Sequence, residues 1–252
     1  MVVNSIFKKR YHLEFDDVDF MKKLKLSTLF LFFQEVANLH SEELGVGLDT
    51  LDKEYNVAWV LIRLRADIIR YPQWNDEIIM ETWHQEPKKY EFERDFIVRD
   101  IHGNIIIKGV STWVIIDKTT RELKKSSLIP YKPSPIIAGR AIECKLGRLK
   151  AIKEREVIYK RIVGYSDIDV NGHLNNSKYI DFIMDCFSFE DHKRYRVKSI
   201  QINYMNEALP DDAILICKDV SKFDENIMYM EGIREKNNDI VFRADIEIEK
   251  NI

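Results

Sequence analysis

The alternation of hydrophobic and polar residues predicts several antiparallel strands. Apolar and polar residues alternate at period two over 62–68 and again over 240–248, as in strands with one buried face. Other strand-like segments are 77–83, 90–98 and 105–116. Residues 100–104, Asp-Ile-His-Gly-Asn, lie between the last two of these segments and predict a hairpin turn.

Two segments have helical periodicity instead. One helical face in the second half collects Tyr179, Ile180, Ile183, Met184 and Phe187. Asn175 or Asn176 is expected to cap the N-terminus of that helix. In the first half, Ser27 is the expected cap, and residues 29–33 are apolar on nearly every side, which predicts a buried helix that ends near the Gly-Val-Gly of 45–47.

The two halves are related by a diverged internal repeat. Residues 15–20 align with residues 165–170, so that Asp17 falls on Asp167 (167 − 17 = 150). Both copies continue into a helical segment and then into alternating strands. A repeat of this length indicates two copies of one domain.

We therefore expect an N-terminal domain over 1–130, a linker over 131–149 and a C-terminal domain over 150–252. Prolines at 130, 133 and 135 favour an extended connector at this boundary. One helix followed by consecutive antiparallel strands predicts an α+β domain, with each sheet wrapped around its helix.

Composition narrows the function. The 252 residues carry a net charge of −3, which argues against a general nucleic-acid binder. No apolar run reaches the roughly 18 residues of a membrane span. The three cysteines are widely spaced, so neither a disulfide framework nor a structural zinc site is expected. The N-terminus turns basic after its apolar residues, the reverse of a secretory signal, so a cytoplasmic location is expected.

Polar residues are concentrated in 165–179. Asp167, Asp169 and Asn171 fit the start of a calcium-binding loop, but Lys178 stands where that loop needs a glutamate, so no metal is expected. Alternatively, Asp169, Asn171 and His173 alternate just before a helix. If that stretch is extended, their side chains share one side.

A helix start also offers backbone N–H groups for a developing oxyanion, here at Asn175 and Asn176. A carboxylate, an amide, an imidazole and an oxyanion site suit acyl transfer or hydrolysis. Capping and structural roles compete with this interpretation. The first repeat keeps Asp17 and Asp19 but has Met21 and Lys23 in place of the asparagine and the histidine. The aspartates are thus expected to serve the fold in both halves, and one active site is expected per chain.

Residues 169–176, Asp-Val-Asn-Gly-His-Leu-Asn-Asn, resemble the D-x-N-x-H-[VL]-N-N signature of acyl-ACP thioesterases, which include plant plastid enzymes and bacterial relatives. Thr82-Trp83 and residues 113–123 resemble two further segments of that family. The resemblance implies a tandem double hotdog fold, in which each repeat is an antiparallel sheet wrapped around a long central helix.

The resemblance also implies a catalytic network of Asp169, Asn171 and His173 with a glutamate on a later strand, which falls on Glu207. Ala208 replaces the plant cysteine, so a cysteine–histidine mechanism is not expected. The implied reaction releases a free fatty acid from acyl carrier protein without a cofactor. Either Asp169 or Glu207 activates water, or Asp169 attacks first and forms an anhydride.

The implied partner is acyl carrier protein with an acyl chain on its 4'-phosphopantetheine, and the implied source is a bacterial cytoplasm. The acyl chain is expected in the N-terminal domain, where Trp59 and Trp83 are candidate lining residues or plain core. The acidic carrier requires a basic surface. Its candidates are Lys8, Lys9, Arg10, Lys88, Lys89, Lys124 and Lys125. A homodimer is left open, as are an acyl-CoA thioesterase and a non-catalytic acyl-binding protein.

Overall fold

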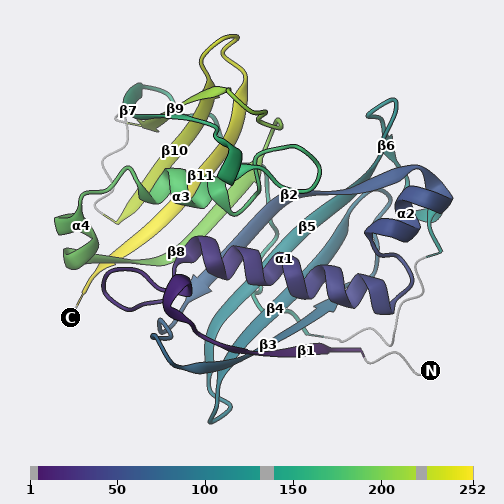
Figure 1. Cartoon of the computed structure of the whole chain (residues 1–252), viewed down its shortest axis with the longest axis horizontal. Coiled ribbons are helices and arrows are strands. Elements are labelled where there is room, and N and C mark those ends of the chain that lie inside the picture. Colours follow the sequence, from purple (N-terminus) through teal and green to yellow (C-terminus); the bar gives the residue numbers. More distant parts are fainter. Residues whose placement is uncertain (1–4, 131–138, 220–225, 252) are drawn as a thin grey trace. The chain divides into compact units, whose positions relative to one another are not determined.

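A computed structural model of the chain describes residues 5–130, 139–219 and 226–251. The chain divides into two compact units, which we call the N-terminal unit (Met1–Leu24 and Leu31–Leu146) and the C-terminal unit (Lys25–Phe30 and Gly147–Ile252). In each unit, neighbouring strands pair in antiparallel fashion and are accompanied by helical elements (Figure 1). Within the described ranges, no helix is long and apolar enough to cross a membrane.

The strands of the N-terminal unit are β1 (Phe7–His12), β2 (Val57–Ile68), β3 (Glu77–His84), β4 (Phe92–Asp100), β5 (Ile105–Asp117) and the short β6 (Leu123–Lys124). Their order is β1-β3-β4-β5-β2, and β6 pairs with β5. The predicted hairpin turn is confirmed, because the N–H of Gly103 donates to the carbonyl of Asp100 over 3.0 Å. Gly103 has a φ of 85°, a conformation in which a glycine carries no steric cost.

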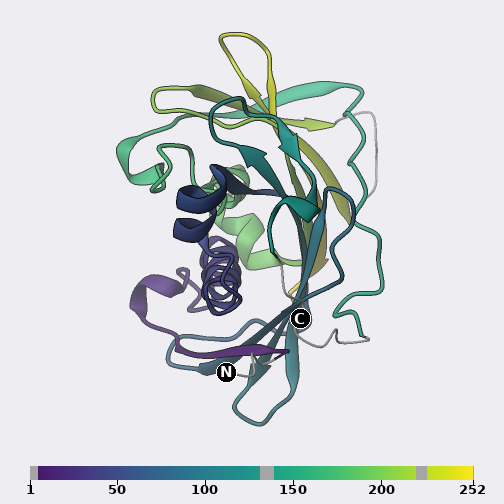
Figure 2. The same ribbon diagram turned by 90° about the vertical axis from the view of Figure 1, so that its right-hand side faces the viewer.

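Helix α1 (Leu26–Glu43) crosses one face of this sheet, and α2 (Leu48–Tyr55) follows it (Figures 1 and 2). Phe33 of α1 packs on Phe96 of β4, with ring centroids 4.4 Å apart. A Cβ atom at Gly109 would lie 2.8 Å from Cζ of Phe33, so the glycine allows the helix to approach β5 closely. Leu31 keeps 46% of its surface exposed, so the expectation of a helix buried all round is wrong on that side.

The expected cap at Ser27 is also wrong. Leu26 is the first residue of α1, and the N–H of Leu29 already donates to the carbonyl of Lys25 over 3.0 Å. Ser27 therefore lies inside the first turn, where its side chain cannot cap the helix.

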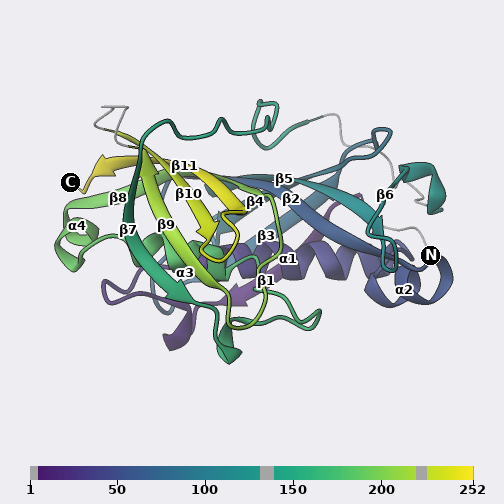
Figure 3. The same ribbon diagram turned by 90° about the horizontal axis from the view of Figure 1, so that it is seen from above.

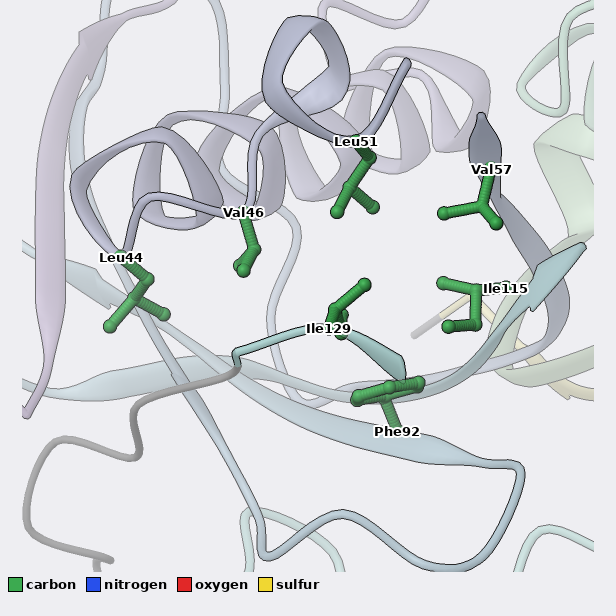
Figure 4. Close-up of a cluster of buried hydrophobic side chains, with 7 residues drawn as sticks. All are labelled: Leu44, Val46, Leu51, Val57, Phe92, Ile115 and Ile129. Atoms are coloured by element: carbon green, nitrogen blue, oxygen red, sulfur yellow. The ribbon is translucent and has the colours of Figure 1, made fainter. Parts of the chain in front are cut away.

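A second part of the N-terminal core lies around α2. Figure 4 shows buried side chains that converge between α2, its flanking turn and the ends of the strands. They are Leu44, Val46, Leu51, Val57, Phe92, Ile115 and Ile129. Trp59 packs against this cluster and donates its indole N–H to the carbonyl of Val46 over 2.9 Å. Trp59 is therefore a partly buried residue at the edge of this core cluster.

The C-terminal unit repeats the strand order of the N-terminal unit. Its strands are β7 (Arg155–Ile162), β8 (Tyr195–Tyr204), β9 (Ala213–Asp219), β10 (Ile227–Arg234) and β11 (Ile240–Lys250). They follow the order β8-β11-β10-β9-β7, which Figure 3 shows from above. Matched to β2-β5-β4-β3-β1, this order confirms the internal repeat read from the sequence.

The helical part of the second repeat is shorter than expected. Helix α3 spans Lys178–Met184, and a separate helix α4 spans Phe189–Arg194. The break arises because Ser188 caps a new helix, since its hydroxyl accepts the N–H of Asp191 over 3.1 Å. Tyr179 of α3 packs edge-on against Tyr204 of β8, so the short helix still lies against its sheet.

The expected linker, 131–149, lies partly outside the described residues. Its described part, residues 139–149, contains no helix or strand. Ala141 and Leu146 pack on Trp83 and Val110 of the N-terminal unit. The N–H of Ala141 also donates to the buried carboxylate of Asp95 over 2.8 Å. The part of this stretch from Ala141 to Leu146 is therefore fastened to the N-terminal sheet.

Candidate functional site

Residues Asp169–His173 form a closed turn rather than the extended stretch that the alternation suggested. The N–H of Asp169 donates to the carbonyl of His173 over 2.8 Å, and the N–H of Gly172 donates to the carbonyl of Asp169 over 3.1 Å. Ile168 and Leu174 pair at the base of the turn. Gly172 has a φ of 79°, a left-handed conformation that favours glycine.

The carboxylate of Asp169 holds this turn together. Its Oδ1 accepts the N–H of Asn171 over 2.8 Å and that of His173 over 3.3 Å, and its Oδ2 lies 3.4 Å from Nδ2 of Asn171. The first repeat has the same arrangement, where Oδ1 of Asp19 accepts the N–H groups of Met21 and Lys23 over 2.8 and 3.0 Å. Asp169 therefore has a structural role that Asp19 shares.

Asp17 and Asp167 form a second matched pair. Each accepts one backbone N–H over 2.9 Å, from Glu14 and Gly164 respectively, at the start of a 3₁₀ turn. Together with the Asp19–Asp169 match, this confirms that the aspartates serve the fold in both repeats.

His173 meets Glu207 in the C-terminal unit. Nε2 of His173 lies 3.3 Å from Oε2 of Glu207, and the two side chains are 28% and 39% exposed. Glu207 lies in the loop after β8 and not on a strand, contrary to what the resemblance implied. The loop is held to the Asp169 turn because the N–H of Leu174 donates to the carbonyl of Ala208 over 2.9 Å. The carboxylate and the imidazole thus form a partly exposed acid–base pair.

The first repeat has the same backbone arrangement without these functional groups. There the N–H of Leu24 donates to the carbonyl of Pro72, also over 2.9 Å, so Pro72 is the counterpart of Ala208. Tyr71 then occupies the place of Glu207, and Lys23 the place of His173. The fold forms without an imidazole–carboxylate pair, so the pair in the second repeat is a feature added to the fold.

The two asparagines expected at an oxyanion site are used differently. Oδ1 of Asn175 accepts the N–H and the hydroxyl of Ser177, both over 2.9 Å, and the carbonyl of Asn175 accepts the N–H of Lys178 over 2.8 Å. The carbonyl of Asn176 accepts the hydroxyl of Tyr204 over 3.0 Å. Ser177 directly precedes α3, but its φ and ψ are helical and its side chain makes no capping hydrogen bond. Asn175 accepts N–H groups of the helix start through both its side chain and its carbonyl, so the expected asparagine cap is confirmed at Asn175, and two of those N–H groups are already occupied.

Most of the expected basic residues carry an acidic partner. Lys8 pairs with Glu81 over 2.7 Å and Arg10 with Glu77 over 3.1 Å. The remaining contacts are Lys9 with Glu35, Lys88 with Glu93, Lys124 with Asp117 and Glu122, and the ammonium group of Lys89 over the ring of Tyr90. Paired charges cancel at a distance, so these contacts argue against a strongly basic docking surface there.

One of these pairs predicts a pH effect on stability. Burial by itself would raise the pKa of Glu81, but hydrogen bonds and charges from Lys8 and Arg99 outweigh it and lower the pKa below its ordinary value of 4.5. A carboxyl group whose pKa is lower in the folded state than in the unfolded state stabilises the fold at pH values above its unfolded-state pKa. This contribution is lost as the pH falls through its folded-state pKa. We expect Glu81→Gln to be less stable than the native chain at pH 7 and to approach it at pH 3.5.

Urea unfolding at the two pH values measures this difference. Glu77→Gln is the matched control, because Glu77 pairs with Arg10 on the same strand pair but is 44% exposed. Such surface pairs contribute about 0–1 kcal/mol. An equal effect of both substitutions at pH 7 would show that the buried position of Glu81 does not matter.

A buried polar cluster in the N-terminal unit was not anticipated. Nη1 of Arg94, a residue only 5% exposed, lies 2.9 Å from Nδ1 of His40 and 3.3 Å from Oγ1 of Thr82. Burial and then the charge of Arg94 lower the pKa of the neighbouring His84 to about 4, so His84 is uncharged at neutral pH. The sequence did contain a signal for this buried arginine. Arg94 is spaced by two or four residues from Phe92, Phe96 and Val98, so it lies on the apolar face of β4.

Trp83, the other tryptophan considered for the acyl site, is 5% exposed and donates its indole N–H to the carbonyl of Gly139 over 3.2 Å, which makes it a core residue.

All three cysteine thiols have a raised pKa, first of all because of burial, and the pKa of Cys186 reaches about 12. Within the described ranges, no group of three or more histidine, cysteine and acidic side chains is placed to hold a metal ion.

Comparison with known proteins gives concordant matches over both repeats. Residues 4–127 match the acyl-ACP thioesterase N-terminal domain, and residues 150–250 match the acyl-ACP thioesterase C-terminal domain. An acyl-ACP thioesterase from Bacteroides thetaiotaomicron has 27% sequence identity and a TM-score of 0.85, over 97% of this chain and 98% of that one. The 12:0-ACP thioesterase from Umbellularia californica has a TM-score of 0.82 at 21% identity, over 98% of both chains. These likenesses confirm the α+β tandem double hotdog.

Curated plant proteins also match. An acyl-[acyl-carrier-protein] hydrolase of Cuphea viscosissima is 26% identical over 248 residues, which cover 92% of this chain and 59% of the relative. A palmitoyl-acyl carrier protein thioesterase of Arabidopsis thaliana is 26% identical over 226 residues, which cover 83% of this chain and 54% of the relative. The chain thus spans between half and two thirds of the length of these curated relatives.

Proposed function

The chain belongs to the acyl-ACP thioesterase family, and from this premise we propose that it hydrolyses the thioester of a fatty acyl chain on acyl carrier protein. The observation that carries the proposal is the contact between His173 and Glu207, 3.3 Å apart on a loop arrangement that lacks both groups in the other repeat. The products are a free fatty acid and the thiol of the carrier's 4'-phosphopantetheine. The proposed setting is fatty acid synthesis in a bacterial cytoplasm.

Glu207 is the proposed general base. Its carboxylate takes a proton from water while the water oxygen attacks the thioester carbonyl carbon. The carbon–sulfur bond then breaks, and the proton passes to the departing sulfur. His173 orients the carboxylate and, together with Asn171, polarises the carbonyl. A positioned acid–base group of this kind contributes about 10²–10⁴-fold to the rate.

Asp169 is proposed to position the catalytic turn rather than to attack the substrate. Its carboxylate oxygens already accept the N–H groups of Asn171 and His173 and approach the amide of Asn171. An attack by Asp169 would disturb these contacts. Asp19 makes the corresponding contacts in the repeat that lacks the acid–base pair, so they belong to the fold. The shared contacts therefore support direct attack by water.

Isotope labelling distinguishes the two routes. Direct attack places oxygen from the solvent only in the fatty acid, whereas an anhydride that water cleaves at the carboxyl carbon of Asp169 would place solvent oxygen in the aspartate carboxylate. After many turnovers in H₂¹⁸O, we expect mass spectrometry of the peptide that contains Asp169 to show no ¹⁸O. Incorporation of the label into that peptide would establish the anhydride route.

The function itself is tested by release of thiol from a panel of acyl-ACP substrates of different chain length, with the matching acyl-CoA esters assayed in parallel. We expect faster release from acyl-ACP. Faster release from acyl-CoA would identify an acyl-CoA thioesterase. Binding of acyl chains without thiol release from either substrate would identify a non-catalytic acyl-binding protein.

A further inference from the structure

The peptide bond between Glu207 and Ala208 is held from both sides. On one side, the guanidinium of Arg234 donates through Nη2 to the carbonyl of Glu207. On the other side, the N–H of Ala208 donates to the hydroxyl of Tyr179 over 3.3 Å. A loop residue next to the acid–base pair is therefore fixed by two side chains from other elements, β10 and α3.

Arg234 is itself held firmly. Its Nε donates to Oδ2 of Asp212 over 2.8 Å, and its Nη1 donates to Asp239 over 3.0 Å. The side chains of Arg234 and Asp212 are only 11% and 3% exposed. Lys236 donates to the other oxygen of Asp212 over 2.8 Å, so each oxygen of that carboxylate accepts a hydrogen bond from a cationic side chain. The guanidinium can thus hold the carbonyl of Glu207 in one place.

The first repeat shows that the fold does not need these two contacts. Leu29 is the counterpart of Tyr179 (179 − 29 = 150) and has no hydroxyl. Pro72, the counterpart of Ala208, has no N–H to be held. The first repeat therefore lacks both groups that form the contact on the Ala208 side, the hydroxyl and the N–H.

Arg234 also has no counterpart of its kind. Each sheet has an irregularity in register, after Val98 in β4 and after Gly232 in β10, and Asp100 and Arg234 each lie two residues beyond it. Both residues also open a hairpin, with backbone bonds from Asp100 to Asn104 and from Arg234 to Asp239. Asp100 uses its carboxylate on the N–H groups of its own turn. The two contacts that hold the Glu207–Ala208 peptide therefore occur in the repeat that contains the His173–Glu207 pair, and the matching residues of the first repeat do not make them.

We propose that Arg234, held in place by Asp212, is a positioning residue that keeps the carboxylate of Glu207 directed at His173. The role rests on the hydrolysis proposed above. Arg234 acts through the backbone of Glu207 and does not touch the substrate. Without it, the carbonyl of Glu207 loses the contact from Arg234, and the 39% exposed side chain is held less firmly toward His173. A misplacement of about 1 Å can cost on the order of 10²-fold in rate.

Arg243 supplies a matched control in the same sheet. Its Nε donates to the buried carboxylate of Glu231 over 2.7 Å, its Nη1 donates to the carbonyl of Leu149 over 3.2 Å, and its side chain is 14% exposed. Arg243→Met therefore removes a buried ion pair and a carbonyl contact, as Arg234→Met does, but away from Glu207.

The test measures kcat, KM and amide hydrogen exchange in both variants of the full chain. We expect Arg234→Met to lower kcat about 10- to 100-fold relative to Arg243→Met with little change in KM, and the Ala208 amide to exchange faster in Arg234→Met alone. Arg234→Lys should recover part of kcat, because a shorter cation can still donate to the carbonyl. Equal kcat values for Arg234→Met and Arg243→Met, or unchanged exchange at Ala208, would overturn the proposal.

Two further outcomes stay informative. If the native chain releases no thiol from any acyl thioester, the proposed function fails, and the exchange rate at Ala208 still decides whether Arg234 fixes this peptide. If Arg234→Met does not fold, Tyr179→Phe takes its place, because it removes only the hydroxyl that accepts the N–H of Ala208. We expect that variant to speed exchange at Ala208 and to lower kcat several-fold, and native values for both would overturn the proposal.

Discussion

Glu207→Gln and His173→Ala should each lower kcat by about 10²–10⁴-fold while the fold stays intact. Glutamine keeps the shape of Glu207 but cannot take a proton from water. Alanine removes the imidazole whose Nε2 lies 3.3 Å from that carboxylate. Both side chains are partly exposed, so neither substitution leaves a cavity in the core. Steady-state thiol release measures the loss, and circular dichroism checks the fold.

The repeat supplies controls for this prediction. Lys23 and Tyr71 occupy the places of His173 and Glu207 in the first repeat, so Lys23→Ala and Tyr71→Phe change the equivalent backbone positions without removing the acid–base pair. We expect both to keep kcat within about threefold of the native value, as for changes outside a catalytic group. The double variant of His173 and Glu207 should be little worse than either single variant, because the two groups act as one unit. Near-native turnover in Glu207→Gln would remove Glu207 from the mechanism.

Phe33→Ala should destabilise the N-terminal unit by about 3–5 kcal/mol, which is the cost of emptying a fully buried aromatic site. Phe33 is 0% exposed, packs on Phe96 and covers Gly109. Urea unfolding followed by circular dichroism measures the loss. Leu31→Ala is the control on the same helix, where an exposed position should change stability by no more than about 0.5 kcal/mol.

The substitution Gly109→Ala tests the same contact between Phe33 and β5 from the side of the strand. Alone, Gly109→Ala brings its new Cβ to 2.8 Å from Cζ of Phe33, and overpacking of this kind costs about 1–3 kcal/mol. In the Phe33→Ala background the clash is gone, so the double variant should lose less stability than the sum of the two single losses. Strict additivity would show that Phe33 and Gly109 do not press on one another.

Much of the fold could be predicted from the sequence, because period-two alternation indicates strands with one buried face and the internal repeat indicates two copies of one domain. The predicted strand segments and the hairpin at 100–104 are present in the structure, and the repeat is visible in the matching strand order of the two halves. The helices were harder to predict. Ser27 and Asn175 both have the chemistry of a cap, but only Asn175 accepts N–H groups at the start of its helix, whereas the first helix already begins before Ser27. Ser188 broke the second helix through a local hydrogen bond that no apolar periodicity reveals.

The candidate site was predicted unevenly for a physical reason. Asp169, Asn171 and His173 are close in sequence, so their spacing could be read directly, although they form a turn and not a strand. Glu207 lies 34 residues beyond His173 (207 − 173 = 34) and came only from resemblance to a family. The positions of Arg234 and Tyr179 depend on tertiary contacts between β10, α3 and one loop, which no local pattern encodes. Charge partners such as Glu81 were invisible for the same reason, so the basic residues looked more available than they are.

The raised pKa values of the three cysteine thiols bear on how this protein can be handled. A thiol whose pKa lies well above neutrality is almost entirely protonated and reacts slowly with disulfides and alkylating agents. Colorimetric thiol reagents should therefore measure the released phosphopantetheine thiol with little background from the protein's own cysteines. With alanine at position 208, storage in air should leave turnover untouched by the oxidation to which a sulfur atom in that loop would be prone.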